Sequence, residues 1–295
     1  MLLTGLRCVG AGLLLVVFSA SRKLRFRQPG ALVLAAVLAL FNAVGTLVGM
    51  TYAVRDLNSG LASLLFYLQP VIFTAVAVPV LGERLSLRRG LGMLVGVAGL
   101  ILVLLPRSHG RISWLGVALA LGAAVSWALG ASIQALVRKR LEEGSPPRWA
   151  GMTSATDSSV LISTLGPQFL LGGVAVLVVS PWLNRWPTTH SALGPSLWAL
   201  VLTVSSAAGW LLYVRLIKAG VPVPRIAAAS FAVPLVANVI GYIFLREQLG
   251  ALGVVGGMMI VLSILGVARP QQRRSQPGPT GGTSLGTPDA RGRWR

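Results

Sequence analysis

The sequence predicts an all-α polytopic membrane protein, an inverted-repeat helical bundle of nine spans. Apolar residues make up 54% of the 295 residues and charged residues only 11%, a composition typical of helices surrounded by lipid. The 35 glycines fall mostly inside apolar runs, where they let helices approach closely. Part of the first half also recurs near the end of the chain at a constant offset of 164 residues, which indicates a duplication.

Nine apolar windows are long enough to cross a bilayer as helices. We expect the spans at about 2–20, 31–54, 58–81, 89–106, 113–137, 163–182, 195–217, 224–245 and 250–268. The first window is similar to a cleavable signal peptide, because the small residues 19–21 follow its apolar core. Cleavage would require the basic cluster at 22–27 to cross the membrane, so we expect a retained helix. Residues 271–295, rich in Pro, Gly, Ser, Thr and Arg, are expected to form a disordered basic tail.

The net charge of +19 sets the orientation of the spans. Of the 26 Lys and Arg residues, 20 fall on the side of the C-terminus when the loops are assigned alternately to the two sides. The positive-inside rule therefore predicts a cytoplasmic C-terminus and, with nine spans, an outer N-terminus. We expect a multi-pass protein of the inner (cytoplasmic) membrane, in contact with the lipid bilayer and with no nucleic-acid partner. The single cysteine, Cys8, excludes a disulfide within the chain.

Four residue pairs define the duplication at the offset of 164: Pro70 with Pro234, Glu83 with Glu247, Leu85 with Leu249 and Gly92 with Gly256. Five crossings separate the span of the first proline from that of the second, so the second copy is inverted in the membrane. The same offset carries Gly45 onto Gly209, and a shift of 161 superposes the first span on the sixth. The fifth span has no partner, so residues 1–106 form a four-span copy and 113–268 a five-span copy. Inverted repeats are typical of transporters that work by alternating access.

Several segments carry a resemblance to a known family: residues 58–70, 81–85 and 92–105 in the first half, and 127–130 and 234–249 in the second. In their order and spacing they resemble the EamA branch of the drug/metabolite transporter superfamily. The resemblance implies ten helices as two inverted five-helix repeats, and it implies a membrane transporter. Two departures are visible: Arg246 replaces the glycine before the second glutamate, and the family's first helix is missing. The expectations are thus a metabolite exporter, or a truncated homologue that does not transport.

Polar and aromatic residues inside the spans are the candidates for a small-molecule substrate cavity, because polar groups in a membrane usually face the interior of the bundle. Each could instead serve helix packing or interhelical hydrogen bonding. Pro70 and Pro234 each free a backbone carbonyl, either to line the cavity or as a static kink. Together the set suits amino acids, aromatic metabolites or amphipathic drugs. Its members are Arg7, Asn42, Tyr67, Gln69, Pro70, Trp127, Gln134, Gln168, Trp210, Tyr213, Pro234, Asn238 and Tyr242.

The charged and titratable residues suggest no enzyme. Arg7 could bind an anionic substrate, pair with a carboxylate or extend to the outer interface. Glu83 and Glu247 lie at helix ends, where we expect structural roles in capping or ion pairing. His109 and His190 are isolated in loops, so we expect no catalytic residue, no metal and no cofactor, with an intramembrane enzyme as the remaining alternative. The sequence leaves a homodimer open.

Overall fold

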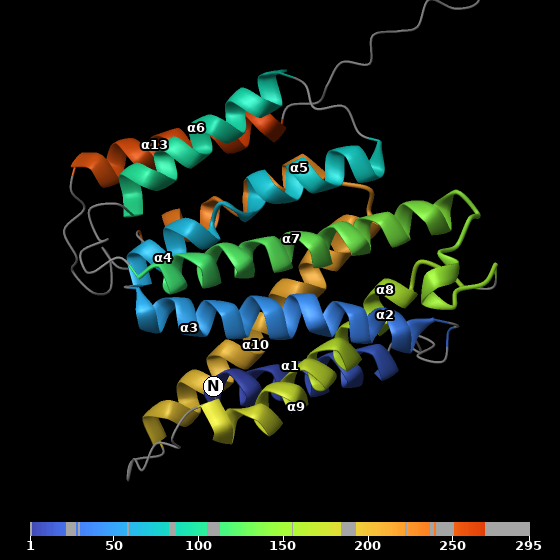
Figure 1. Ribbon diagram of the computed structural model, residues 1–295. Helices are drawn as coiled ribbons and strands as arrows, with labels where there is room; N and C mark the ends of the chain where they lie inside the picture. The colour runs from blue at the N-terminus through green and yellow to red at the C-terminus, as the bar shows by residue number, and fades with distance from the viewer. Residues whose placement is uncertain are drawn as a thin grey trace, which may run out of the picture.

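Long helices lying side by side make up the protein (Figure 1). The computed structural model describes residues 2–21, 28, 30–57, 59–82, 87–104, 113–154, 156–183, 193–221, 223–236, 239 and 251–268. Among these residues there is no strand, and six helices are long and apolar enough to cross a membrane. Two shorter apolar helices, Gly90–Leu104 and Ala251–Gly266, accompany them. The predicted all-α membrane fold is confirmed.

The first four predicted spans are all helical. They are α1 (Leu2–Ser21), the continuous run α2 (Ala31–Leu38), η1 (Ala39–Val48) and α3 (Gly49–Asp56), then α4 (Ser59–Phe66) with α5 (Gln69–Leu81), and α6 (Leu87–Leu104). The third span is broken rather than smoothly bent, because Pro70 stands at the start of α5 and cannot continue α4. In the second span, η1 is a π-helix, a wide form that is frequent at functional sites.

The later spans begin with α7 (Trp114–Glu142) and continue through η3 (Arg148–Ala150), α8 (Val160–Ser163), α9 (Leu165–Leu183), α10 (Leu193–Lys218), α11 (Val223–Ala229) and α13 (Ala251–Ala268). The hydroxyl oxygen of Ser113 caps α7 by accepting a hydrogen bond from the backbone N–H of Gly116 (3.2 Å). Helix α7 runs five residues past the predicted end at 137, since cations are favourable in a helix's last turn. The predicted roles of Glu83, Asn238, Tyr242, Glu247 and the tail 271–295 concern residues outside the described part of the chain.

Glycine contacts between α1 and α9 follow the inverted duplication. A Cβ atom on Gly12 would lie 2.8 Å from the backbone nitrogen of Leu170, and one on Gly173 would lie 2.8 Å from that of Val9. The two contacts are equivalent, because the shift of 161 residues carries Gly12 onto Gly173 and Val9 onto Leu170. Gly12 and Gly166 are also reciprocal, because a Cβ on either would lie within 3.2 Å of the other's carbonyl oxygen. Only glycine lets two backbones come so close.

Helices α6 and α13 form the matching pair on the other side of the bundle (Figure 1). Their first residues, Leu87 and Ala251, are 164 apart, and so are their last. Gly96 faces the hydroxyl of Ser263, with 2.6 Å from its Cβ position to Oγ, while Gly99 faces Ile260 at 3.1 Å. These two contacts are also equivalent, because the offset of 164 carries Gly96 onto Ile260 and Gly99 onto Ser263. Both helix pairs are therefore antiparallel and related by the same kind of two-fold symmetry.

The symmetry fails around α7. Gly45 of η1 packs directly against Ser126 of α7. Its counterpart Gly209, on α10, has no atom of the described residues within 4 Å of its Cβ position. Helix α7 thus covers a face in the first copy whose equivalent in the second copy is open in the described part of the chain.

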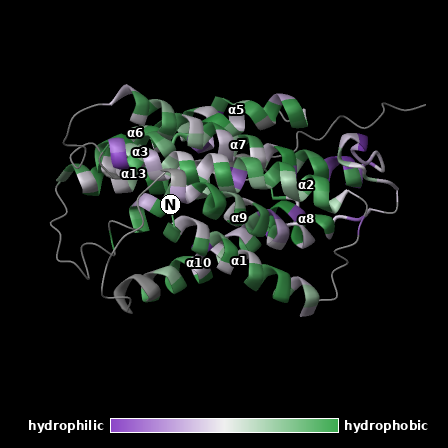
Figure 2. Ribbon diagram, turned by 60° about the horizontal axis from the view of Figure 1, so that its bottom comes forward, coloured by the Kyte–Doolittle hydropathy of each residue, from purple (hydrophilic) through white to green (hydrophobic). Residues whose placement is uncertain are grey.

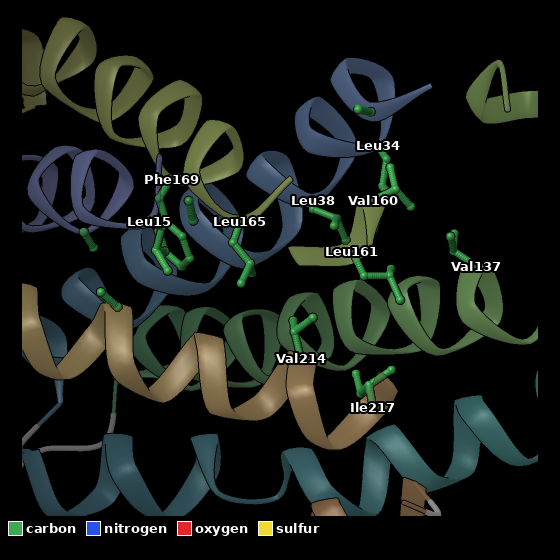
Figure 3. Close-up of a cluster of buried hydrophobic side chains, with 14 of the residues drawn as sticks. Leu15, Leu34, Leu38, Val137, Val160, Leu161, Leu165, Phe169, Val214 and Ile217 are labelled. Carbon is green, nitrogen blue, oxygen red and sulfur yellow. The ribbon is translucent and has the colours of Figure 1, made fainter. Parts of the chain in front are cut away.

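An extended apolar cluster is formed by α1, α2, α7, α9 and α10. Leu15, Leu38, Leu165, Phe169 and Val214 are each almost fully buried there, and the cluster extends to Val137 and Ile217 (Figure 3). The outward faces of the helices are also hydrophobic, and most hydrophilic residues gather toward the helix ends (Figure 2). An apolar exterior with polar ends is what a lipid bilayer requires.

Candidate functional site

A row of aromatic rings crosses the interior from α5 to α9. Phe73 of α5 lies edge-on to Trp127 of α7, with 5.6 Å between the ring centroids. Trp127 contacts Tyr213 of α10 at 5.7 Å, and Tyr213 contacts Trp210 at 5.5 Å. Trp210 in turn meets Phe169 of α9 at 5.5 Å. These separations fall in the range where aromatic pairs attract, so the row aligns three predicted cavity residues with two phenylalanines.

Three carboxamides lie among the most deeply buried polar groups. The exposed fraction is 1% for Asn42 and 0% for Gln134 and Gln168. Within the described part of the chain, neither the amide nitrogen nor the amide oxygen of any of the three has a hydrogen-bond partner. Burying such groups without partners costs about 1–3 kcal/mol each. Polar groups this costly mark the place where a polar ligand or water would bind.

Asn42 of η1 packs against Gly130 of α7, one helical turn from Gln134. Gly130 of α7 has no side chain, and its Cβ position is only 2.8 Å from the Cγ atom of Asn42. Trp127 lies about one turn before Gly130 on α7, and Gln134 about one turn after it. The glycine therefore leaves room for the amide of Asn42 on the face of α7 that also carries Trp127 and Gln134.

Helix α9, which carries Gln168, packs against the same part of η1. Gly172 packs against Ala43, the neighbour of Asn42. Gln168 precedes Gly172 by one helical turn and is followed directly by Phe169 of the aromatic row. The four elements η1, α7, α10 and α9 thus form a closed ring, each in contact with the next. We call this ring the central site.

The central site contains six of the predicted cavity residues, but not all of them. The six are Asn42, Trp127, Gln134, Gln168, Trp210 and Tyr213, and the hydroxyl of Tyr213 is likewise buried without a partner in the described residues. Tyr67 instead packs against the apolar cluster of Leu100, Phe231 and Ile260 between α6 and α13. Gln69, Pro70 and Pro234 are buried near the breaks in their spans, outside the aromatic row.

Arg7 lies nearer the predicted outer end than the central site does. It is five residues into α1, whereas Trp127 is thirteen residues into α7. Thr4, about one turn before Arg7, places its hydroxyl oxygen 3.3 Å from that of Thr51 on α3. The Nε atom of Arg7 is buried and has no partner within the described residues. The predicted role of Arg7 in binding a substrate stays a prediction.

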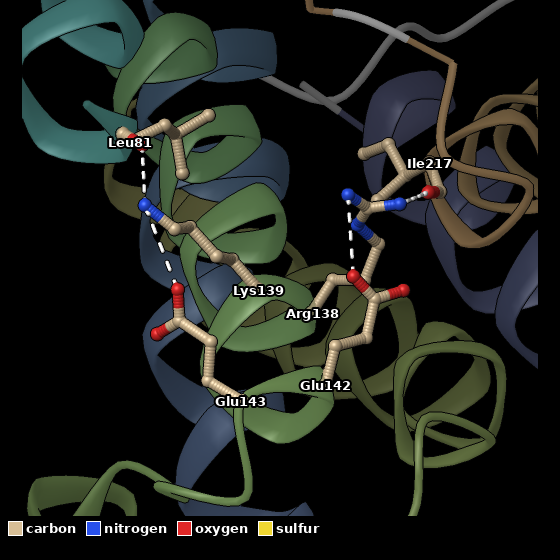
Figure 4. A network of polar contacts seen from close by, with 6 residues as sticks. All are labelled: Leu81, Arg138, Lys139, Glu142, Glu143 and Ile217. Atoms are coloured by element: carbon tan, nitrogen blue, oxygen red, sulfur yellow. Dashed lines mark hydrogen bonds and ion pairs between the residues drawn. The ribbon is translucent and has the colours of Figure 1, made fainter. Parts of the chain in front are cut away.

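At the predicted cytoplasmic end, α7 is tied to two other helices (Figure 4). The ammonium of Lys139 donates to the carbonyl oxygen of Leu81, the last residue of α5, and the guanidinium of Arg138 donates to that of Ile217 in α10 (3.1 Å). Glu142 lies 3.4 Å from Arg138 and Glu143 lies 3.7 Å from Lys139. Lys139 thus supplies a donor to the last carbonyl of α5, while Arg138 adds a second donor to a carbonyl that also accepts from the backbone N–H of Gly220 (3.0 Å).

A second polar contact joins the loop before α2 to the loop before α8. The side-chain amide of Gln28 donates to Asp157 (3.2 Å) and to the hydroxyl of Ser159 (2.7 Å). The backbone N–H of Asp157 donates back to Gln28 (3.2 Å). Hydrogen bonds from Ser159, and then from Gln28, hold the pKa of Asp157 below its ordinary value. Sequence reasoning missed this contact, because its partners are about 130 residues apart.

Comparison with known proteins supports the architecture. A sequence profile of the EamA-like transporter family matches residues 1–105. Over 276 residues the chain is 30% identical to the uncharacterized transporter YvbV of Bacillus subtilis, covering 90% of this chain and 81% of that protein. The chain belongs to the EamA-like transporter family. This EamA-like transporter is also 26% identical over 275 residues to the chloroplastic WAT1-related protein At3g02690 of Arabidopsis thaliana, covering 90% of the chain and 62% of the relative.

A solved crystal structure shares the fold of this EamA-like transporter. The two superpose with a TM-score of 0.69 at 18% sequence identity, over 90% of this chain and 87% of the other. The predicted family is therefore confirmed, and the chain is a multi-pass membrane transporter of the drug/metabolite type. The predicted cavity residues, the two-copy boundaries and the transported compound remain predictions.

Proposed function

We propose that this EamA-like transporter exports small amphipathic or aromatic metabolites, such as amino acids, related metabolites or drugs, across the cytoplasmic membrane. The central site carries the proposal. It combines three buried carboxamides without partners in the described residues and a row of aromatic rings, contributed by helices of both sequence copies. Such a mixed polar and apolar site suits a small organic molecule.

Alternating access is supported by the symmetry of the glycine contacts. In the α1–α9 pair, shifting one glycine contact by 161 residues gives the second contact of the same pair. In the α6–α13 pair, a shift of 164 residues does the same. Two inverted copies can adopt each other's conformation at similar energy, which exposes a central site first to one side and then to the other. We place the C-terminus in the cytoplasm because 20 of the 26 basic residues lie on its side.

Transport by purified protein in liposomes tests the proposal. Vesicles loaded with a panel of amino acids, aromatic metabolites and dyes would be compared with vesicles that hold the Trp127→Ala variant. Leu200→Ala is the matched control, because Leu200 is exposed on the outer face of α10, away from the rings. We expect movement of at least one compound by the unmodified protein and by the control, and slower movement by Trp127→Ala. Failure to move any compound, with the protein folded, would refute the proposal.

The direction of transport requires a second measurement. Cells with and without the gene would be loaded with the compound that the liposomes identify, and its release would be followed. Export predicts faster release and a lower internal level in cells that carry the gene. Faster accumulation instead would refute export while leaving transport intact.

A further inference from the structure

We infer that the central site binds an uncharged, planar aromatic molecule that carries an amide-like hydrogen-bonding group. The inference rests on the proposed transport function and narrows its substrate class. It depends on three features of the site: the absence of charge in the described turns that form it, the chemistry of its unpartnered groups and the placement of its rings.

The turns that form the central site carry no charged side chain. Between Trp114 and Val137 of α7, and between Leu193 and Val214 of α10, the sequence contains no Asp, Glu, Lys or Arg. The same holds for all of η1 and α9. An ion entering this site would lose its hydration and gain no opposite charge, which is costly in a low-dielectric interior. The site therefore disfavours both anions and cations.

The unpartnered groups can each both donate and accept a hydrogen bond. Each carboxamide of Asn42, Gln134 and Gln168 offers an N–H₂ group and a carbonyl oxygen, and the hydroxyl of Tyr213 offers both functions. A ligand amide presents the complementary pair, an N–H and a C=O. A ligand with only acceptors or only donors would leave part of this set unsatisfied, at a cost in affinity.

Aromatic side chains lie on the same helices as two of these amides. Trp127 lies two helical turns before Gln134 on the same face of α7, and Phe169 follows Gln168 directly on α9. Tyr213 and Trp210 connect the two through ring contacts of 5.5 to 5.7 Å. A planar ring beside the amide group of the ligand would meet these side chains edge-on or stacked. The geometry points to one ligand that uses both kinds of contact together.

Three probes of the same size and different charge test the inference. Benzamide is neutral, benzoate is an anion and benzylamine is a cation at neutral pH. Binding to the purified full-length protein in lipid nanodiscs would be measured by isothermal titration calorimetry. We expect benzamide to bind at least about tenfold more tightly than either ion. Equal affinities, or tighter binding of an ion, would overturn the inference.

Two variants sharpen the test. Gln168→Glu keeps the shape of the side chain and adds a negative charge, so it should weaken the binding of benzamide and strengthen the binding of benzylamine. Gln134→Leu removes one amide and should weaken benzamide by about three- to tenfold. Ser205→Ala is the control, because Ser205 is exposed on α10 and its hydroxyl bonds to the carbonyl of Leu202 in its own helix (3.2 Å). The same affinity for benzamide in Gln134→Leu and the control would contradict the assignment.

Failure here and failure of the proposed function give different results. If the liposomes transport a charged compound and benzamide does not bind, the ligand class is wrong and transport stands. If benzamide binds and no compound in the panel is moved, the site is correct and the transport proposal fails. The comparison of the three probes uses the unmodified protein, so it does not depend on the folding of any variant.

Discussion

The broken symmetry around α7 makes a sharp prediction for two equivalent glycines. Gly45 and Gly209 occupy the same position in the two copies of the duplicated segment. A methyl group at Gly45 would collide with the hydroxyl of Ser126 on α7, whereas one at Gly209 meets nothing within 4 Å among the described residues. We expect Gly45→Ala and Gly209→Ala to change the free energy of unfolding in opposite directions.

The magnitudes follow from the two environments. Forcing a methyl group into a packed contact costs about 1–3 kcal/mol, because α7 must move away from η1. An open helix position instead gains up to about 1 kcal/mol when alanine replaces glycine, since alanine loses less backbone freedom. The two variants should therefore differ by about 1–4 kcal/mol in the free energy of unfolding.

Thermal unfolding in detergent, followed by size-exclusion chromatography of the heated samples, measures the difference. Gly45→Ala should lower the midpoint by several degrees, and Gly209→Ala should leave it unchanged or raise it. Adding Ser126→Ala to Gly45→Ala should recover part of the loss, because it removes the oxygen that the new methyl group meets. If Gly209→Ala is as destabilising as Gly45→Ala, the face of α10 at Gly209 is covered in the folded protein and the reasoning is wrong.

Three further predictions concern polar groups. Lys139→Met should lower the midpoint of thermal unfolding, because it leaves the carbonyl of Leu81 without the donor of Lys139. Lys139→Arg should retain most of the stability, and equal losses in the two variants would contradict a stabilising role for this hydrogen bond. Asp157→Ala should lower the free energy of unfolding at pH 7, but this loss should fade as the pH falls below about 4, since an acid whose pKa is lowered on folding stabilises the protein only while it is ionised. Denaturation of both proteins at several pH values measures the loss, and a loss that does not change with pH would refute the prediction. Gln134→Leu should raise the unfolding midpoint even as it weakens benzamide binding, because leucine removes a buried amide without partners, and a lower midpoint would show that this amide is satisfied in the folded protein.

The positions of the spans could be predicted because lipid imposes a simple length and hydropathy rule. The described residues of the nine windows are mostly helical, although the third window is interrupted at residues 67–68 and much of the eighth lies outside the described part of the chain. The local backbone geometry is harder to predict from the sequence. The π-helical turn at Ala39–Val48 depends on packing against α7 and α9, which leaves no pattern in the apolar sequence. At the break before Pro70, Tyr67 and Leu68 form a turn in which the backbone N–H of Leu68 bonds to the carbonyl of Leu65, three residues back (3.3 Å).

The candidate site could be predicted only as a set of residue types. Amides and tyrosines stand out in an apolar span, so Asn42, Gln134 and Gln168 were visible. Phe73 and Phe169 were missed because a phenylalanine in a membrane helix looks the same whether it faces lipid or a binding site. Tyr67 was placed with them by type, but the break at Pro70 directs it toward α6 and α13.

The contacts between α1 and α9 have a consequence for how this gene can change over generations. Gly12 and Gly166 come from two copies of one ancestral segment, and each touches the backbone of the other. A codon change at either position alters the space available to the backbone of the other copy. The two copies therefore cannot drift apart independently at these sites, even where the rest of their sequences has diverged. A side chain larger than hydrogen at either position would need a compensating shift in the backbone of the other copy.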